Sequence, residues 1–194
     1  MQKPRYKIPL IGTSMVGKTS IAERLARGTF NSYKDSTIGA AYCMIRRDDF
    51  DIDLWDTAGQ ERYLSLVKFY LRYSDVLLFV VDVTNLVESF ERLDYYLSSI
   101  DICKDIIVIG NKIDVLLNDS IDEIEKHTRK EFKKYEEKFN IYYINVSAKE
   151  NINIDKLMEL ISTVCKSISK EIKEENLQLN NISTGYNYYN YCNC

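Results

Sequence analysis

The pattern Gly-x-x-x-x-Gly-Lys-Thr at residues 12–19 constrains the fold of this chain more than any other feature. It follows an apolar run at residues 8–11 and precedes a helix-like segment at residues 20–27. In that context the glycines let the backbone approach a phosphate group, and the loop N–H groups and the helix N-terminus face its negative charge. The pattern therefore predicts a phosphate-binding loop for a nucleoside triphosphate. A glycine-rich turn with a surface lysine is the less favoured alternative.

The loop gives individual side chains expected roles. Lys18 is expected to reach the β- and γ-phosphates, and the Thr19 hydroxyl is expected to bind Mg²⁺. The loop residues predicted to contact the nucleotide are Ser14, Met15, Val16, Gly17, Lys18, Thr19 and Ser20.

Length and composition limit the class of protein. With 194 residues and a formal charge of −3, the chain suits one domain and lacks the positive field expected of a nucleic-acid-binding protein. No stretch has the apolar length of a membrane-spanning helix, and the N-terminus lacks the apolar core of a secretory signal. Five cysteines without framework spacing predict a reducing compartment, and one histidine argues against a zinc site. Cys43, Cys103 and Cys165 are expected to be small core residues.

Apolar runs alternate with helix-like stretches along the chain, which is typical of an α/β domain. Residues 76–81 and 106–109 are continuously apolar, as expected of parallel strands covered on both faces. Between residues 40 and 55, two runs flank a charged turn, which predicts a hairpin with one antiparallel edge strand. Strands are predicted at residues 6–11, 40–46, 50–55, 75–81, 106–109 and 142–146, and helices at 20–27, 61–73, 86–99, 121–139 and 152–173.

These elements predict a three-layer α/β domain with a six-stranded, mostly parallel sheet and about five helices. Its ligand is expected at the carboxyl ends of the strands. Residues 1–173 would form this domain. Residues 174–194, where Asn and Tyr become frequent and periodicity is lost, are expected to form a flexible tail.

Asn111-Lys112-Ile113-Asp114 follows a buried-strand pattern and predicts a site for guanine. The Asp114 carboxylate can accept hydrogen bonds from N1–H and the 2-amino group of guanine, which adenine lacks. A site built on such a requirement discriminates by roughly 10⁴ or more. Asn111 would hold the loop together, and the Lys112 stem would pack on the purine. By itself the Asn-Lys-x-Asp pattern is equally a polar turn.

Two further segments are expected to contact the base. The residues that follow the last strand and offer backbone N–H groups to the guanine oxygen are Ser147, Ala148 and Lys149. Phe30, in the loop after the first helix, can stack on the edge of the guanine.

Residues around the terminal phosphate are predicted in two other loops. Asp56 ends a strand and can hold Mg²⁺ through water, while Gly59 leaves its backbone N–H open to the γ-phosphate. Gln60 is placed to orient an attacking water. Thr37 can close on both Mg²⁺ and the γ-phosphate, so the predicted metal ligands are Thr19, Thr37 and Asp56. A strand followed by a polar turn, with Thr57 as N-cap, would explain the turn but not this spacing.

Together these residues resemble the Ras superfamily of small GTPases from Tyr6 to about Lys173. Residues 37–42 (TIGAAY), 55–66 (WDTAGQERYLSL) and 82–84 (DVT) are similar to Rab proteins. The Ile-Gly-Ala-Ala run in particular resembles the early-endosomal branch of that family.

The resemblance implies a switch that binds GTP or GDP with Mg²⁺ and hydrolyses GTP slowly until an activating protein supplies an arginine. Gln60, Lys18 and Thr37 would be its catalytic residues. The GTPase domain would be monomeric and would regulate vesicular traffic by recruiting effectors. Other implied partners are an exchange factor, a GTPase-activating protein, and the escort and dissociation-inhibitor proteins of prenylated Rabs. The implied location is the cytoplasmic face of endosomal or other vesicle membranes, in exchange with the cytosol.

The chain departs from the family pattern at several positions. Tyr73 stands where Rabs carry a glycine, and Ser14 and Met15 stand where Ras carries glycines. Methionine in the phosphate loop is bulkier than usual and is expected to affect hydrolysis.

Cys192 and Cys194 end the chain and resemble the double geranylgeranylation signal of Rabs. Two lipids would give the stable membrane anchoring that one lipid does not provide. A C-a-a-X box is excluded because residue 191 is tyrosine. Two unmodified thiols on a flexible tail are the alternative.

Two other functions compete with the switch. One is a nucleotide-binding interaction module with negligible turnover, although Thr37, Asp56 and Gln60 favour a competent enzyme. The other is an ATP-dependent kinase or ATPase, which Asp114 argues against because a carboxylate there matches guanine.

Overall fold

The computed structural model describes residues 3–33, 35–60, 63–100, 103–116 and 121–185. In chain order its elements are β1 (Arg5–Ile11), α1 (Lys18–Arg27), β2 (Ala40–Arg46), β3 (Asp51–Thr57), α2 (Leu64–Leu71), β4 (Val76–Asp82), α3 (Leu86–Phe90), α4 (Leu93–Ser98), β5 (Asp105–Asn111), α5 (Ile121–Phe132), β6 (Asn140–Val146) and α6 (Ile154–Gly185). The six strands form one sheet in the order β2-β3-β1-β4-β5-β6. Only β2 runs antiparallel to its neighbour among these pairs, which confirms the predicted mostly parallel sheet with one antiparallel edge strand.

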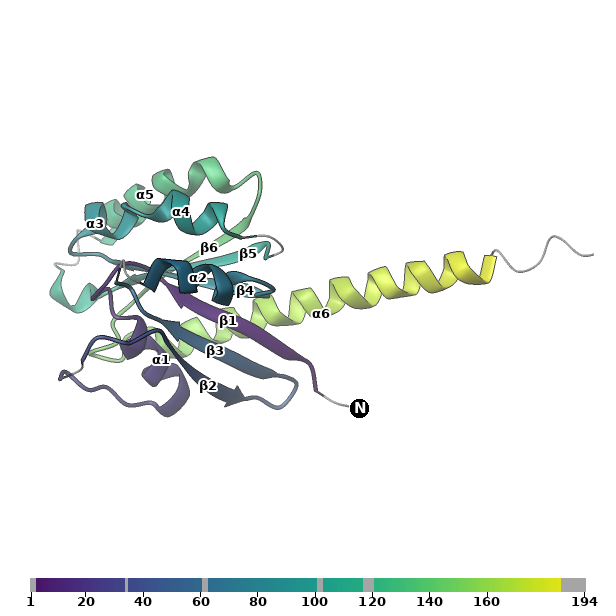
Figure 1. The fold of residues 1–194 in the computed structure, drawn as a ribbon, viewed down its shortest axis with the longest axis horizontal. Coiled ribbons are helices and arrows are strands. Elements are labelled where there is room, and N and C mark those ends of the chain that lie inside the picture. The colour runs from purple at the N-terminus through teal and green to yellow at the C-terminus, as the bar shows by residue number, and fades with distance from the viewer. Residues whose placement is uncertain (1–2, 34, 61–62, 101–102, 117–120, 186–194) are drawn as a thin grey trace, which may run out of the picture.

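Helices cover both faces of the sheet, as the predicted three-layer fold requires (Figure 1). Side chains alternate along β4, so Val76, Leu78 and Val80 pack toward α1 and α6. Leu77, Phe79 and Val81 pack toward α2, α4 and α5. Because both faces are covered, β4 and β5 must be apolar along almost their whole length, which is the pattern visible in the sequence.

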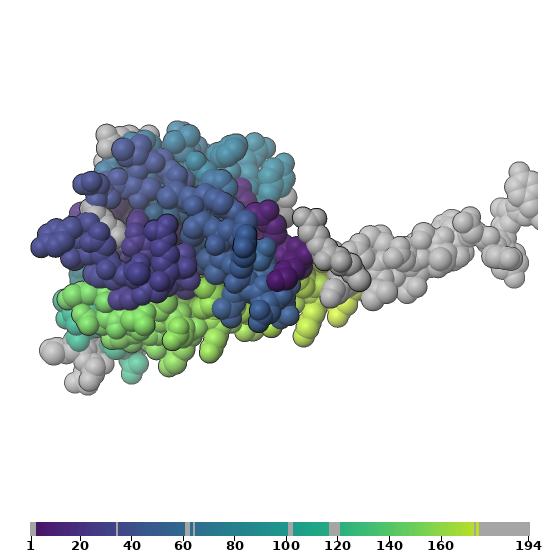
Figure 2. All heavy atoms as spheres, turned by 90° about the horizontal axis from the view of Figure 1, so that it is seen from below, coloured from purple at the N-terminus to yellow at the C-terminus, as the bar shows by residue number. Residues whose placement is uncertain are grey.

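One face of the domain is formed by α1 and α6. Figure 2 shows α6, in green, lying beside α1, in indigo. The buried side of α6 includes Ile154, Leu157, Ile161 and Cys165, with spacings of three and four residues. This spacing places them on one face of the helix, directed toward the core.

The predicted helix at residues 86–99 is divided into α3 and α4 by a turn at Glu91 and Arg92. The Ser89 hydroxyl donates to the Asn85 carbonyl at 2.8 Å and accepts a bond from the Asp82 backbone N–H at 2.9 Å. A serine bonded four residues back tends to bend a helix. The five predicted helices are therefore present in the described residues, with one of them in two pieces.

Two predicted helix ends were wrong. The helix predicted to end at Phe139 stops at Phe132, and a 3₁₀ turn at Lys133–Tyr135 follows. This turn lets Phe139 enter the core and lets the Asn140 backbone N–H reach the Lys104 carbonyl at the start of β6.

The last helix continues to Gly185 instead of ending at Lys173, because residues 174–184 contain no proline or glycine to interrupt it (Figure 1). The division into a domain and a flexible tail stays a prediction. The helix predicted at residues 61–73 corresponds to α2, which spans Leu64–Leu71. Residues 61–62 lie outside the described ranges.

The predicted core cysteines lie in or against the core. Cys103 and Cys165 are buried, Cys43 is half-buried, and all three are free thiols. Burial raises the pKa of the Cys103 and Cys165 thiols to about 12, so both stay protonated and act as small apolar groups. Among the described residues, no helix combines the length and the apolar character needed to cross a membrane.

The parallel strands bring the predicted site residues together. The carboxyl ends of β1, β3, β4 and β5 lie at one edge of the sheet, and β4 and β5 are paired so that Asp82 lies opposite Asn111. The phosphate loop begins directly after β1, and Asp56 lies near the end of β3. Segments separated by up to about a hundred residues in the sequence therefore meet at this edge.

Candidate nucleotide-binding site

The phosphate loop needs glycine at two positions because neighbouring atoms of β4 and β5 lie too close for a side chain. A Cβ added at Gly12 would lie 2.3 Å from the Val80 carbonyl oxygen. A Cβ added at Gly17 would lie 2.2 Å from Asn111 Nδ2. Both glycines also have positive φ angles, 143° and 98°, which favour glycine. The loop is thus packed tightly against β4 and β5 before any ligand is considered.

Two residues that depart from the family pattern have left-handed backbone conformations. Met15 has a φ of 63° and is 84% exposed, and Tyr73 has a φ of 57°. A non-glycine residue in this region costs on the order of 1 kcal/mol. The backbone at both positions therefore favours glycine, and methionine and tyrosine are costly there.

Lys18 is held inside the loop. Its ammonium donates to the carbonyl oxygens of Gly12 at 3.0 Å and Thr13 at 2.7 Å, and the residue is only 5% exposed. Burial lowers the pKa of Lys18 to about 8, although the nearby Asp56 carboxylate acts in the opposite direction. A Cβ added at Gly59 would lie 2.4 Å from the Lys18 ammonium, so Gly59 leaves the space that this cation occupies.

The three predicted metal ligands lie together. The Thr19 hydroxyl donates to Asp56 Oδ2 at 2.7 Å, and the Thr19 and Thr37 hydroxyl oxygens are 2.9 Å apart. Thr37 Oγ1 is 3.4 Å from the same carboxylate oxygen. Hydroxyl and carboxylate oxygens are the ligands that Mg²⁺ prefers in proteins. The chemistry of this set therefore fits a magnesium ion.

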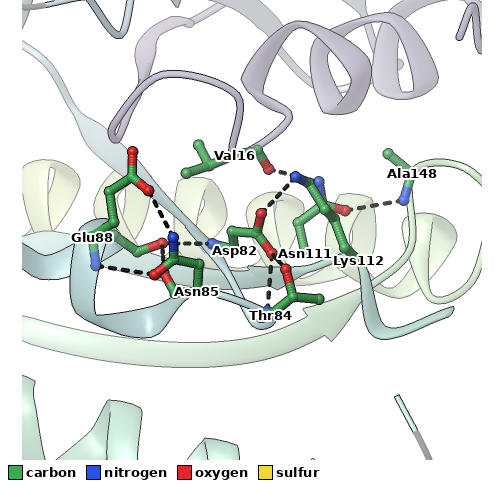
Figure 3. A network of polar contacts seen from close by, with 9 residues as sticks. Val16, Asp82, Thr84, Asn85, Glu88, Asn111, Lys112 and Ala148 are labelled. Atoms are coloured by element: carbon green, nitrogen blue, oxygen red, sulfur yellow. Dashed lines mark hydrogen bonds and ion pairs between the residues drawn. The ribbon is translucent and has the colours of Figure 1, made fainter. Parts of the chain in front are cut away.

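Asn111 joins the phosphate loop to the base loop. Its side-chain amide donates to the Val16 carbonyl at 2.8 Å and accepts a bond from the Ala148 backbone N–H at 3.1 Å (Figure 3). The Asp114 carboxylate accepts a bond from the Ser147 hydroxyl at 2.6 Å, and Lys149 Nζ is 4.0 Å from its other oxygen. The three segments predicted to bind phosphate and guanine are thus physically linked.

A cavity of about 430 Å³ lies between these segments. Its lining includes the predicted residues Ser14, Met15, Gly17, Lys18, Thr19, Ser20, Phe30, Thr37, Gly59, Gln60, Asn111, Lys112, Asp114, Ala148 and Lys149. Val16, Asp56 and Ser147 do not line it. They are buried behind it and bind residues that do: Val16 accepts from Asn111, Asp56 accepts from Thr19, and Ser147 donates to Asp114.

Two residues with clear contacts in the site were not predicted as site residues. Arg24, on α1, donates to the Ala148 carbonyl at 2.7 Å and to the Lys149 carbonyl at 2.8 Å, and it lies over the Phe30 ring at 5.7 Å. Asp82 accepts a bond from Lys112 Nζ at 2.5 Å. Nothing in the local sequence of α1 indicates the role of Arg24. The sequence did point to Asp82, which ends a buried strand and belongs to the Rab-like segment 82–84.

The pKa of Lys18 predicts a pH dependence for nucleotide binding. In the ligand-free protein the lysine loses its proton above about pH 8, whereas phosphate oxygens would favour the charged form. Binding must then take up a proton, so the affinity for GTP is expected to fall toward about tenfold per pH unit above pH 8. Titration with a fluorescent GTP analogue from pH 7 to pH 9.5 measures this. A constant affinity over that range would contradict it.

Comparison with known proteins places the fold and the site in context. A family model described as the Ras family matches residues 7–168. The chain is 32% identical over 187 residues to the Ras-related protein Rab-30 of Homo sapiens, Bos taurus and Mus musculus, covering 92% of this chain and 87% of each relative. The residues matched by the family model include all the segments that line the cavity.

A solved structure shares the fold at much lower identity. The bacterial selenocysteine-specific elongation factor EF-Sec superposes with a TM-score of 0.71 and 20% identity over 84% of this chain. The matched region is 29% of that longer protein. At this identity the likeness concerns the fold alone.

Proposed function

This chain belongs to the Ras family, and from that premise we propose that it acts as a Rab-type switch in vesicular membrane traffic. It is a Rab-like small GTPase that binds guanine nucleotides, hydrolyses GTP and works with regulators and effectors. The observation that carries the proposal is the Asn111 side chain, which joins the phosphate loop to the base loop around one cavity.

We infer that the cavity holds the nucleotide with its phosphates at residues 14–20 and its base at Asp114. The Lys18 ammonium, already turned toward the loop carbonyls, would exchange these weak partners for phosphate oxygens. The carboxylate of Asp114 would face the polar edge of guanine, whereas the Ala148 backbone N–H, which was also predicted to bind the base, already donates to the Asn111 side chain at 3.1 Å. Phe30, which lines the same cavity, would cover the edge of the base.

We infer that Thr19, Thr37 and Asp56 hold Mg²⁺. When bound, the ion would neutralise negative charge that develops on the phosphate oxygens during hydrolysis. Thr37 and Thr19 come from different segments. Loss of the terminal phosphate would therefore weaken the interactions that hold these two segments in contact. The Ala58 backbone N–H donates to the Gly39 carbonyl at 2.8 Å, so the segments that carry Thr37 and Gly59 are coupled. Structures with GDP and with a non-cleavable triphosphate test whether these segments change.

Gln60 lines the cavity next to Gly59, where it can orient the attacking water. Replacing Gln60 by leucine removes both polar groups of the amide, and intrinsic GTP hydrolysis is expected to slow by about 10- to 100-fold. Single-turnover hydrolysis of preloaded GTP measures this rate. The dissociation rate of GDP is the control and is expected to stay within about twofold of wild type, because Gln60 lies on the phosphate side of the cavity.

An unchanged hydrolysis rate in the Gln60→Leu variant would remove Gln60 from the water-orienting role. Negligible hydrolysis by the wild-type protein, both alone and with a GTPase-activating protein, would instead favour the alternative of an interaction module without turnover. These two results therefore separate a wrong residue assignment from a wrong function.

We propose that effectors bind an exposed aromatic and aliphatic surface beside the cavity. Trp55 lies between Tyr42 and Tyr70, with ring centroids 5.1 Å and 5.2 Å away. Ile38 is 79% exposed and Phe69 is 67% exposed, so the surface offers apolar area on segments that adjoin Thr37 and Gln60. A partner on this surface would sense the nucleotide state through those two residues.

We propose that lipids on Cys192 and Cys194 attach the protein to endosomal or other vesicle membranes. Both cysteines lie outside the described residues, so the proposal depends on their place in the sequence. Escort and dissociation-inhibitor proteins would then carry the lipidated protein through the cytosol. Localisation of tagged wild-type protein and of the Cys192→Ser, Cys194→Ser double variant tests this, and equal membrane recruitment would contradict it.

A further inference from the structure

Lys112 is fixed at its charged end. Its ammonium donates to Asp82 Oδ2 at 2.5 Å, and the Asp82 side chain is only 13% exposed (Figure 3). The other carboxylate oxygen accepts bonds from the backbone N–H of Thr84 at 2.9 Å and from its hydroxyl at 2.6 Å. Both oxygens of Asp82 are therefore occupied by different partners, and the carboxylate has a defined orientation.

The topology of the sheet brings Asp82 to Lys112. Asp82 is the last residue of β4 and lies opposite Asn111, the last residue of β5. Lys112 follows at once, in a left-handed conformation with a φ of 74°. Asp82 is also held through its backbone, since its N–H donates to the Ser89 hydroxyl on α3 at 2.9 Å. The anchor thus belongs to the rigid sheet and not to a loop.

We propose that Asp82 is a positioning residue for guanine binding, which holds the Lys112 ammonium so that the alkyl stem forms one wall of the base pocket before the nucleotide arrives. The inference rests on the proposed function, in which Lys112 and Asp114 receive guanine. Lys112 and Asp114 line the same cavity, whereas Asp82 does not line it. Asp82 therefore acts through Lys112 and not by touching the base.

The physical benefit is a smaller entropic cost of binding. A lysine side chain has four flexible carbons. If a mobile lysine must become ordered when the ligand binds, the lost conformational entropy weakens the affinity by roughly tenfold or more. Holding the ammonium in advance removes part of that cost from the binding step. Burial tends to raise the pKa of Asp82, but the hydrogen bonds from Lys112 and Thr84 outweigh it and the net pKa is lowered. The carboxylate therefore stays charged at neutral pH and keeps its ion pair with the Lys112 ammonium.

The test measures dissociation of ribose-labelled fluorescent GDP from the full-length protein. The Asp82→Asn variant keeps the size of the side chain but loses its charge, and the dissociation rate is expected to rise by about tenfold. Thr84→Val removes one bond to the carboxylate and is expected to raise the rate by about threefold. Asp53→Asn, which removes the carboxylate that pairs with Arg5 on the sheet surface, is the matched control and is expected to match wild type.

A double-mutant cycle separates positioning from a general structural role. If Asp82 acts through Lys112, the Asp82→Asn, Lys112→Met double variant should release GDP no faster than Lys112→Met alone. Additive effects of the two substitutions, or wild-type release by both Asp82→Asn and Thr84→Val, would overturn the inference.

Failure of the proposed function has a different signature. If the wild-type protein does not bind GDP, the proposed function and this inference fall together. If wild-type protein binds GDP and Asp114→Asn abolishes that binding, but Asp82→Asn releases GDP at the wild-type rate, only the role of Asp82 is wrong.

Discussion

Replacing Asp114 by asparagine is expected to weaken GTP binding by roughly 10³- to 10⁴-fold, because the proposed base pocket depends on a carboxylate that must accept hydrogen bonds. Ser147 donates to Asp114 Oδ1 at 2.6 Å, and an amide oxygen can accept the same bond. The new NH₂ group would then take the place of Oδ2 and face the N–H donors of guanine. The N–H donors of the asparagine and those of guanine would then face each other without acceptors in a desolvated pocket.

The same geometry predicts which nucleotide the Asp114→Asn variant prefers. Xanthine carries a carbonyl oxygen where guanine carries its 2-amino group, so the new NH₂ group can donate to it. Competition against a labelled nucleotide with GTP, XTP and ATP measures the order of affinities. Asp53→Asn is the control for loss of a carboxylate elsewhere on the sheet. Unchanged GTP affinity in the Asp114→Asn variant, or equal competition by ATP in wild type, would contradict the assignment.

Replacing Lys18 by methionine is expected to weaken GTP binding by about 100- to 1000-fold, since truncating one partner of a buried, hydrogen-bonded charge pair has a cost of this order. Methionine keeps the length and the apolar character of the stem. Without nucleotide, the wild-type ammonium is buried and its pKa is lowered, so the variant is not expected to unfold at a lower temperature. The substitution should thus separate binding from folding.

Two measurements check the role of Lys18. Equilibrium titration gives the loss of GTP affinity, and thermal unfolding of the nucleotide-free protein gives the effect on stability. Lys134→Met, at a lysine whose side chain is 58% exposed, is the matched control. The Lys18→Met variant should also lose the fall in affinity above pH 8. Unchanged affinity, or an unchanged pH dependence, would remove Lys18 from the proposed contact with the phosphates.

Much of the site could be predicted because each motif is a local pattern that needs a particular backbone. The phosphate loop, the Asp56-to-Gln60 turn and the Asn111-to-Asp114 turn all lie where the sequence places them, at the carboxyl ends of strands. The buried strands were also predictable, because continuous apolar runs leave few alternatives to a sheet covered on both faces.

Element ends were less predictable because tertiary contacts decide them. The bend between α3 and α4 coincides with Ser89 bonding both to Asn85 and to the end of β4. The helix α5 stops early so that Phe139 can enter the core. In contrast, α6 runs past the predicted end because nothing in its sequence interrupts it, and this could have been read from the absence of proline and glycine.

The sequence by itself determined the order of the elements, the family resemblance and most of the residues predicted to line the cavity, since these follow from short patterns of residue types. Only the tertiary structure decided how the segments support one another. Arg24 binds the carbonyls of Ala148 and Lys149 across more than a hundred residues, and Asp82 reaches Lys112 from a neighbouring strand. Such contacts join side chains that no local pattern relates, because they arise only when the sheet has brought distant chain segments to the same edge.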